Sequence, residues 1–260
     1  MEETGTYFAD VSRIGKIRLS GKSSPEFVNV MTTVEHWRLE TPGQAAIALV
    51  LNAEGEIIDL VMIGRTGEHE YILITSPETV CELTEWLEAH AGLANSEGAA
   101  VFEDIKVEDR TDRIGAFALY GPDAQMILDE MSKSDVSAEL GEKNLTLVSI
   151  GRLQVMILRW PLLRSHGQDM PLKAEGEVFE VYLPAKATDD FKKILLSFAE
   201  IDPEDYGEYF ARRRRAHTCF DAAEQDVYIR PETAGLKALL RSDADFVGAR
   251  ALRKLGILSH

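Results

Sequence analysis

Two long apolar runs separated by a short polar turn dominate the hydrophobic pattern of this chain. Residues 45–51 form one continuous apolar run, and residues 56–63 form a second. The four residues between them, Asn-Ala-Glu-Gly at 52–55, are typical of a tight turn. Apolar runs of this length, bounded by turn residues, are typical of buried strands, so the pattern predicts a β-hairpin over residues 43–63.

One polar residue, Asp59, lies inside the second run, which begins at Glu56. A charged group within such a strand must point out of the sheet or meet a partner, because burying it alone is costly. The alternation of side chains along a strand favours an outward carboxylate on a half-exposed hairpin. The other interpretation places Asp59 at the wall of a ligand cavity. The pattern alone leaves both open.

Shorter patterns predict the remaining elements. Residues 14–19 alternate apolar and basic side chains, which predicts a strand with one solvent-facing side. Ser76, with Thr79 three positions later, is a candidate N-cap for the helix that follows. Apolar positions at helical spacing predict helices, and short apolar runs predict strands. The helices are expected near 25–31, 80–90, 123–131, 187–199 and 245–255, and the strands at 71–75, 101–107, 114–120, 145–158 (two) and 178–183.

The order of these elements indicates the α+β class. Strands and helices alternate without the sustained βαβ rhythm of a doubly wound sheet. The order strand, helix, hairpin, helix occurs near 14–90 and again near 113–199, which predicts two related α/β subdomains.

Composition narrows the possible partners and location. The net charge of -16 disfavours nucleic acid as the main partner, because its phosphates would be repelled. No apolar run approaches the ~20 residues that span a membrane. Cys81 and Cys219 lie far apart and are typical of reduced thiols in a cytoplasmic protein, so neither a disulfide nor a metal site is expected.

Four consecutive arginines, residues 212–215, stand out in so acidic a chain. They are consistent with a solvated helix face. Consecutive residues point around a helix, however, so one or two of the four could face inward and bind an anion. A guanidinium suits carboxylates in bidentate geometry, and Arg212 is the preferred candidate.

Five short segments carry motifs in a fixed order along the chain. They are DVSRIG at 10–15, NAEGEIID at 52–59, ALYGPDA at 118–124, VFEV at 178–181 and DFVGARAL at 245–252. Together they resemble the folate-binding domain of glycine cleavage T-proteins, the aminomethyltransferases. The resemblance implies a central cavity for tetrahydrofolate between two folate-binding subdomains. The first would comprise residues 1–110, with residues 200–260 packing back onto it, and the second residues 111–199.

The resemblance also implies roles for individual residues. Glu180 matches the glutamate of the family's GFEL motif, which hydrogen-bonds the pterin. A carboxylate suits this role because it can accept two N–H donors. Arg212 would bind the glutamate tail of the folate. Asp59 could line the cavity, and Ser76 occupies the position of a family asparagine.

Departures from the family pattern bear on catalysis. The family's IIDD has a second aspartate that is assigned to catalysis, and Leu60 replaces it here. A leucine cannot exchange a proton, so glycine cleavage is not expected and the catalytic residues stay unknown, with Asp59 as the remaining candidate. Ile47 replaces an expected tyrosine, and residues 161–176 replace the family's RTGYTGE loop.

We therefore expect a tetrahydrofolate-binding one-carbon transferase that acts on a small methylated substrate. The alternatives are a non-catalytic folate-binding accessory protein and a subunit of a larger demethylase or amine-oxidising complex. The accessory relatives that maintain iron–sulfur clusters carry a K-G-C-Y-x-G-Q motif, and residues 244–249 contain no cysteine. Because the family's N-terminal segment and C-terminal barrel have no counterpart in this sequence, we expect a homodimer or a second subunit to complete the cavity.

Overall fold

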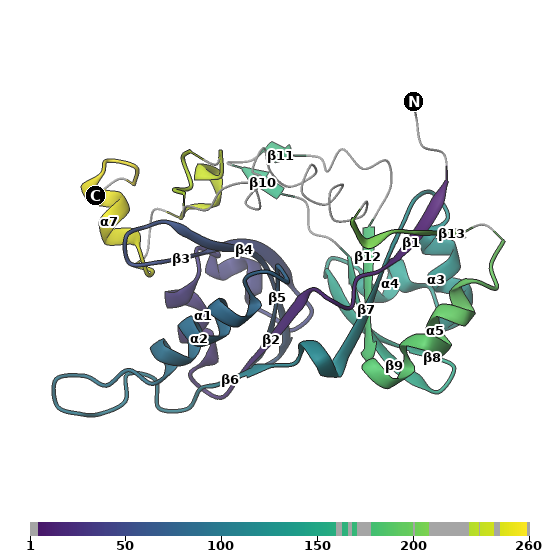
Figure 1. Cartoon of the computed structure of the whole chain (residues 1–260), viewed down its shortest axis with the longest axis horizontal. Coiled ribbons are helices and arrows are strands. Elements are labelled where there is room, and N and C mark those ends of the chain that lie inside the picture. Colours follow the sequence, from purple (N-terminus) through teal and green to yellow (C-terminus); the bar gives the residue numbers. More distant parts are fainter. Residues whose placement is uncertain are drawn as a thin grey trace. The chain divides into compact units, whose positions relative to one another are not determined.

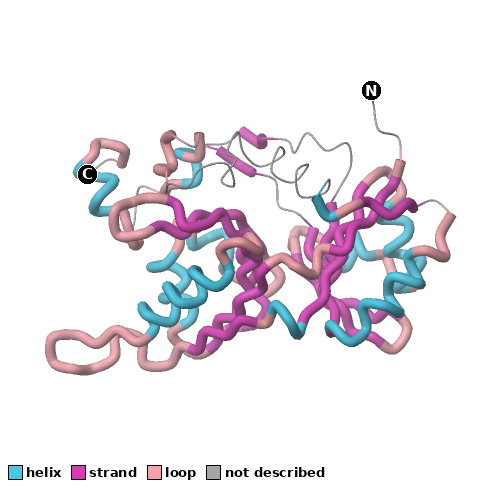
Figure 2. The backbone as a smooth tube through the Cα atoms, viewed as in Figure 1, coloured by secondary structure: helices cyan, strands magenta, loops and turns pink. Residues whose placement is uncertain are grey.

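The computed structural model describes residues 5–159, 163–165, 168–170, 178–199, 201–207, 229–233, 235–241 and 245–258. The chain divides into two units, each built from one main sheet and its helices (Figures 1 and 2). Unit 1 comprises Met1–Ile14 and Thr111–His217, and unit 2 comprises Gly15–Arg110 and Thr218–His260. Both units mix strands and helices, which confirms the α+β class.

Unit 2 contains a five-stranded antiparallel sheet in the order β3-β4-β5-β2-β6. The strands are β2 (Gly15–Ser20), β3 (Ala45–Leu51), β4 (Ile57–Gly67), β5 (Glu70–Thr75) and β6 (Lys106–Asp109). The predicted hairpin is β3–β4. Its turn is held by the Asn52 side-chain oxygen, which accepts hydrogen bonds from the backbone N–H groups of Glu54 and Glu56.

Each face of this sheet has its own apolar cover. Helices α1 (Ser24–Met31) and α2 (Val80–Ala91) lie on one side, as Figure 2 shows, and pack on Ala48, Val50 and Val61. The neighbouring residues Leu49 and Leu51 point the opposite way, because strand side chains alternate. They pack against the C-terminal segment, which contains a 3-10 helix (Lys237–Leu239) and helix α7 (Ala249–Lys254).

Unit 1 contains a six-stranded sheet in the order β13-β1-β7-β12-β9-β8, in which only the β1–β13 pair is parallel. Helices α3 (Ala124–Ser132), α4 (Val136–Leu140) and α5 (Thr188–Leu195) contribute to the apolar core on one face. The strands are β1 (Thr6–Asp10), β7 (Ile114–Tyr120), β8 (Leu145–Ile150), β9 (Leu153–Arg159), β12 (Val178–Pro184) and β13 (Ile201–Glu204).

The two units repeat one arrangement. The sheet order β3-β4-β5-β2 of unit 2 matches β8-β9-β12-β7 of unit 1, and helices α1 and α2 correspond in chain order to α3 and α5. Gly21 and Gly121, with φ of 120° and 109°, turn the chain between the first strand and the first helix of each repeat. These φ values suit glycine alone, which explains the residue at both positions. The prediction of two related α/β subdomains is confirmed.

Several boundaries differ from the predicted ones. Residues 1–14 were expected with the first subdomain, but β1 pairs with β7 and β13 of unit 1. The helix expected over 187–199 is the 3-10 helix Ala185–Ala187 followed by α5, and the strand expected over 101–107 forms only at β6. The short strands β10 (Leu163–Ser165) and β11 (Gln168–Met170) pair within the predicted polar loop.

The expectation of a solvent-facing side on β2 is wrong at Lys16, which is 0% exposed. Arg18, on the same face of the strand, enters a charged cluster with Glu70 and Glu108. Lys106 and Arg110 also contact Glu108, at 2.7 and 2.9 Å. The hydrogen bonds that Lys106 and Arg110 donate, together with their positive charges, lower the pKa of the Glu108 carboxyl to about 2. Within the described parts of the chain, no helix has the length and apolar character needed to cross a membrane.

Candidate functional site

Asp59 lies in β4 with its carboxylate buried on the face covered by α1 and α2. A register shift sets Leu51 opposite Ile57 but Val50 opposite Asp59. Directly opposed side chains share a face of the sheet, so Asp59 points the same way as the core residue Val50. The side chain is 6% exposed. The interpretation of Asp59 as an outward residue is therefore wrong, because Asp59 alternates regularly with Val61 and Ile63 and their face of the sheet is covered by helices.

The Asp59 carboxylate accepts hydrogen bonds from the end of β5 and the turn into α2. Its Oδ1 accepts from the Leu60 backbone N–H at 2.8 Å and from Ser76 Oγ at 2.9 Å. Its Oδ2 accepts from the Ser76 backbone N–H at 2.9 Å, from Thr79 Oγ1 at 2.7 Å and from Thr75 Oγ1. A carboxylate offers about four lone-pair sites, so these donors occupy it. The network joins β4 to the start of α2.

This network corrects the predicted helix cap. Helix α2 begins at Val80 after Thr79, which makes no side-chain capping bond. The hydroxyls of Ser76 and Thr79 bond the Asp59 carboxylate instead, and this negative group lies near the helix N-terminus, where the helix dipole favours it. Sequence reasoning missed Thr75 and Thr79 as partners of Asp59. The available signal was the cluster of hydroxyl residues directly after a buried strand.

Leu60 points away from Asp59, on the opposite face of the sheet. It is partly buried and packs on the apolar cluster that contains Leu49, Phe246 and Leu252. The resemblance places the family's catalytic aspartate at this position. Here the position is an aliphatic side chain among other apolar side chains, so it offers no group for proton exchange.

Glu180 lies near the middle of β12, which pairs with β7 on one side and β9 on the other. The neighbouring residues Phe179 and Val181 face the helical core, so Glu180 points to the other face of the sheet. It is 0% exposed. The Tyr182 hydroxyl, on the same face two residues later, donates a hydrogen bond to Glu180 Oε2. Sequence reasoning missed Tyr182, although the two-residue period of a strand places it beside Glu180.

The structure brings some predicted site residues together and leaves others separate. Asp59 and Ser76 share one network in unit 2, whereas Glu180 belongs to unit 1. Arg212 lies outside the described residues. Contact of any of these residues with a cofactor stays a prediction.

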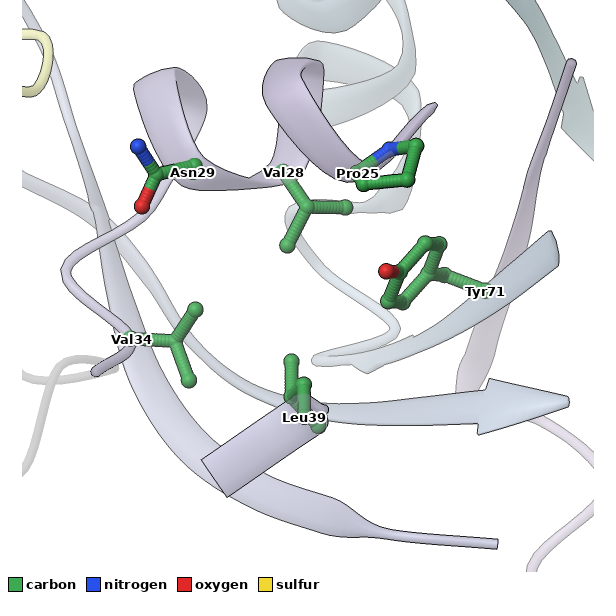
Figure 3. Close-up of a pocket in the computed structure, with 6 residues that line it drawn as sticks. All are labelled: Pro25, Val28, Asn29, Val34, Leu39 and Tyr71. Carbon is green, nitrogen blue, oxygen red and sulfur yellow. The ribbon is translucent and has the colours of Figure 1, made fainter. Parts of the chain in front are cut away.

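A small pocket in unit 2 is a poor alternative site. It is lined by Pro25, Val28, Asn29, Val34, Leu39 and Tyr71 (Figure 3). Its volume of about 10 Å³ corresponds to roughly one water molecule, so a pterin would not fit. The guanidinium of Arg241, from the C-terminal segment, donates hydrogen bonds to two of the lining residues, the Asn29 side chain and the Val34 carbonyl.

Comparison with known proteins identifies relatives over most of the chain. The sequence model of the GCVT N-terminal domain matches residues 3–167. An aminomethyltransferase from Chlorobium limicola is 24% identical over 250 residues, which cover 95% of this chain and 64% of that protein. The Bacillus subtilis aminomethyltransferase is 29% identical over 129 residues, 50% of this chain and 33% of that protein. The chain therefore spans about one to two thirds of the length of these relatives.

Two solved structures resemble the fold of this chain. Aminomethyltransferase T of the glycine cleavage system from Bartonella henselae has a TM-score of 0.72 and 19% identity, and the match covers 97% of this chain and 64% of that chain. A chain of the heterotetrameric sarcosine oxidase from Corynebacterium sp. U-96 has a TM-score of 0.51 and 16% identity, covering 76% of this chain and 85% of that chain. At these identities the likeness establishes the fold.

Proposed function

Because this chain belongs to the GCVT N-terminal domain family, we propose that it binds tetrahydrofolate and transfers a one-carbon unit to it from a small methylated substrate. The observation that carries the proposal is the buried carboxylate of Glu180, on the face of its sheet opposite the helical core. Glu180 stands at the position of the pterin-binding glutamate in the motif that resembles the family's GFEL.

The chemistry of Glu180 fits the proposed ligand. The pterin ring of tetrahydrofolate presents a guanidine-like edge with adjacent N–H donors, and a carboxylate can accept two of them. Charge-assisted hydrogen bonds of this kind are strong when water is excluded, as it is from a side chain that is 0% exposed. In this proposal Arg212 binds the carboxylates of the folate tail.

The proposed reaction relies on positioning. Bound tetrahydrofolate supplies the ring nitrogen that receives the one-carbon unit. Leu60 has no exchangeable proton, so it cannot act as an acid or base. This chain would contribute by orienting the folate and the methyl donor and by excluding water. Asp59 already accepts hydrogen bonds from Ser76 and Thr79, and we assign it to the support of β4 and α2 rather than to proton transfer.

Isothermal titration calorimetry with tetrahydrofolate tests the proposal. We expect wild-type protein to bind and Glu180→Gln, which keeps the side-chain shape, to bind more weakly by about 1–3 kcal/mol, a 5- to 150-fold loss. Glu139→Gln on the surface of α4 is the matched control and should bind as wild type does. Absence of heat with wild-type protein at millimolar folate would contradict folate binding. Equal affinities of the folded Glu180→Gln variant and the control would contradict the role of Glu180.

A second candidate is a non-catalytic folate-binding accessory protein or subunit of a demethylating or amine-oxidising complex. The apolar surroundings of Leu60 favour it, because they leave no proton-exchanging group at that position. Incubation with tetrahydrofolate and a panel of N-, O- and S-methylated compounds, followed by mass spectrometry of the folates, separates the two. Folate binding without turnover, together with a second protein that co-purifies, supports the subunit; one-carbon folate products support the transferase.

A further inference from the structure

Among the strands that the structure describes, β8 forms one edge of the unit 1 sheet, and half of its backbone groups have no partner in a neighbouring strand. The backbone N–H of Arg159 donates to the Asn144 carbonyl at 2.7 Å, and the register continues from this pair to Ile150 opposite Leu153. In an antiparallel pair, alternate residues bond the neighbouring strand and the others point away. The amides of Leu145, Leu147 and Ser149 therefore point to the outer edge, where the described part of the chain provides no hydrogen-bond partner.

This edge lacks the features that usually prevent strand pairing. Residues 144–151, NLTLVSIG, contain no charged side chain and no proline, although 28% of the chain is charged. Natural edge strands are usually protected by charges, prolines, bulges or a covering segment. Leu147 instead presents an aliphatic side chain that is 59% exposed.

The equivalent edge of the other repeat is closed. Strand β3 of unit 2 corresponds to β8 in sheet order. There the Thr33 backbone N–H donates to the Leu49 carbonyl at 3.0 Å, and Thr33 Oγ1 accepts from the Leu49 backbone N–H at 2.9 Å. Among the described residues, the edge at β3 thus has a partner at Leu49, whereas the equivalent edge at β8 has none.

We propose that β8 pairs antiparallel with β8 of a second copy of this chain, with Leu147 on the twofold axis. In this register Leu147 lies opposite Leu147, and Leu145 lies opposite Ser149 of the second copy. All of these residues have outward-pointing amides, so each can donate one backbone hydrogen bond and accept another. A shift by one residue would set outward amides against amides already bonded to β9.

Two features of the strand favour a second copy over an unrelated strand. The twofold axis brings the two exposed Leu147 side chains together and removes them from water. The same register places the end of β8 that carries exposed Glu142 beside the end that carries exposed Arg152 of the other copy. The outermost charges of the edge are therefore complementary between the two copies, with the exposed Lys143 lying between Glu142 and the strand.

Analytical ultracentrifugation tests this interface without any folate. We expect a wild-type dimer and a monomeric Leu147→Lys variant, because pairing would bury two like charges on the axis. Met126→Lys is the matched control: Met126 lies on α3 of the same unit and is 48% exposed, and this variant should dimerise as wild type does. The proposal would be overturned if the wild-type protein stayed monomeric over a 100-fold range of concentration. It would also be overturned if Leu147→Lys formed a dimer with wild-type affinity.

Disulfide trapping tests the register. In a hydrogen-bonded antiparallel pair the Cα atoms are ~5.5 Å apart, within the range of a disulfide. In a Cys81→Ser, Cys219→Ser background, Leu147→Cys should form a covalent dimer on mild oxidation. Thr146→Cys should not form one. In the proposed register the two copies of residue 146 are diagonal neighbours, not directly opposed, and they lie on the sheet face opposite to that of Leu147. Equal trapping of both variants, or of neither, would refute the register. Glu142→Arg should weaken the dimer, and addition of Arg152→Glu should restore it.

Discussion

Replacement of Asp59 tests the assignment of this carboxylate to the β4–α2 connection. Asp59→Ala removes the acceptor for two backbone N–H groups, those of Leu60 and Ser76, and for three hydroxyls. Hydroxyls can rotate toward other acceptors, whereas a buried backbone N–H that loses its acceptor costs about 1–3 kcal/mol. Both N–H groups are partly buried, so together they predict a loss of at most about 2–6 kcal/mol in the free energy of unfolding. This is a large part of the ~5–15 kcal/mol that stabilises a typical domain.

Asp59→Asn separates charge from shape. The amide keeps one acceptor oxygen, so one backbone N–H stays satisfied and the expected loss falls to about 1–3 kcal/mol. Asp135→Ala is the control, because Asp135 caps α4 with one exposed bond to the Ala138 N–H at 2.8 Å and should cost about 0.5–2 kcal/mol.

Urea unfolding measures these losses, and hydrogen exchange should place the loss of protection in residues 70–91. An Asp59→Ala variant no less stable than Asp135→Ala, or with unchanged exchange in that segment, would refute the reasoning.

Three further predictions concern other buried or charged groups. Tyr182→Phe should destabilise the protein by about 1–3 kcal/mol in urea unfolding and weaken tetrahydrofolate binding, because Glu180 loses a hydroxyl donor; unchanged values in both assays would contradict the contact. The pKa of Glu108 is about 2, below its unfolded value near 4.5, so its contribution to stability should be present above pH 4.5 and lost as the pH falls toward 2. Glu108→Gln should flatten this part of the pH–stability curve. An NMR titration midpoint near 4.5 for Glu108 would contradict the prediction. Arg241→Met should lower the free energy of unfolding by about 1.5–3 kcal/mol, because this 5% exposed guanidinium bonds residues at the end of α1; a variant as stable as wild type would show that those bonds contribute nothing.

Local patterns determined much of the fold. The apolar runs at 45–51 and 56–63 predicted the β3–β4 hairpin, and helical spacing predicted α2 and α3, because turns and periodicity depend on residues close in sequence. The repeated order of elements predicted the two related subdomains, which the matching sheet orders confirm. The motif at 178–181 correctly placed Glu180 on a strand.

Only the tertiary structure decided where the polar side chains point and what they contact. Asp59 lies on the sheet face that α1 and α2 cover, and its donors Ser76 and Thr79 lie 17 and 20 residues away in the sequence. Strand β1 forms by pairing with β7, more than 100 residues away, so its own five residues carried too weak a pattern to predict it. Lys16 is buried on a strand whose alternation predicted exposure. Strand register and the cover of a sheet face depend on distant residues, and a local pattern does not contain that information.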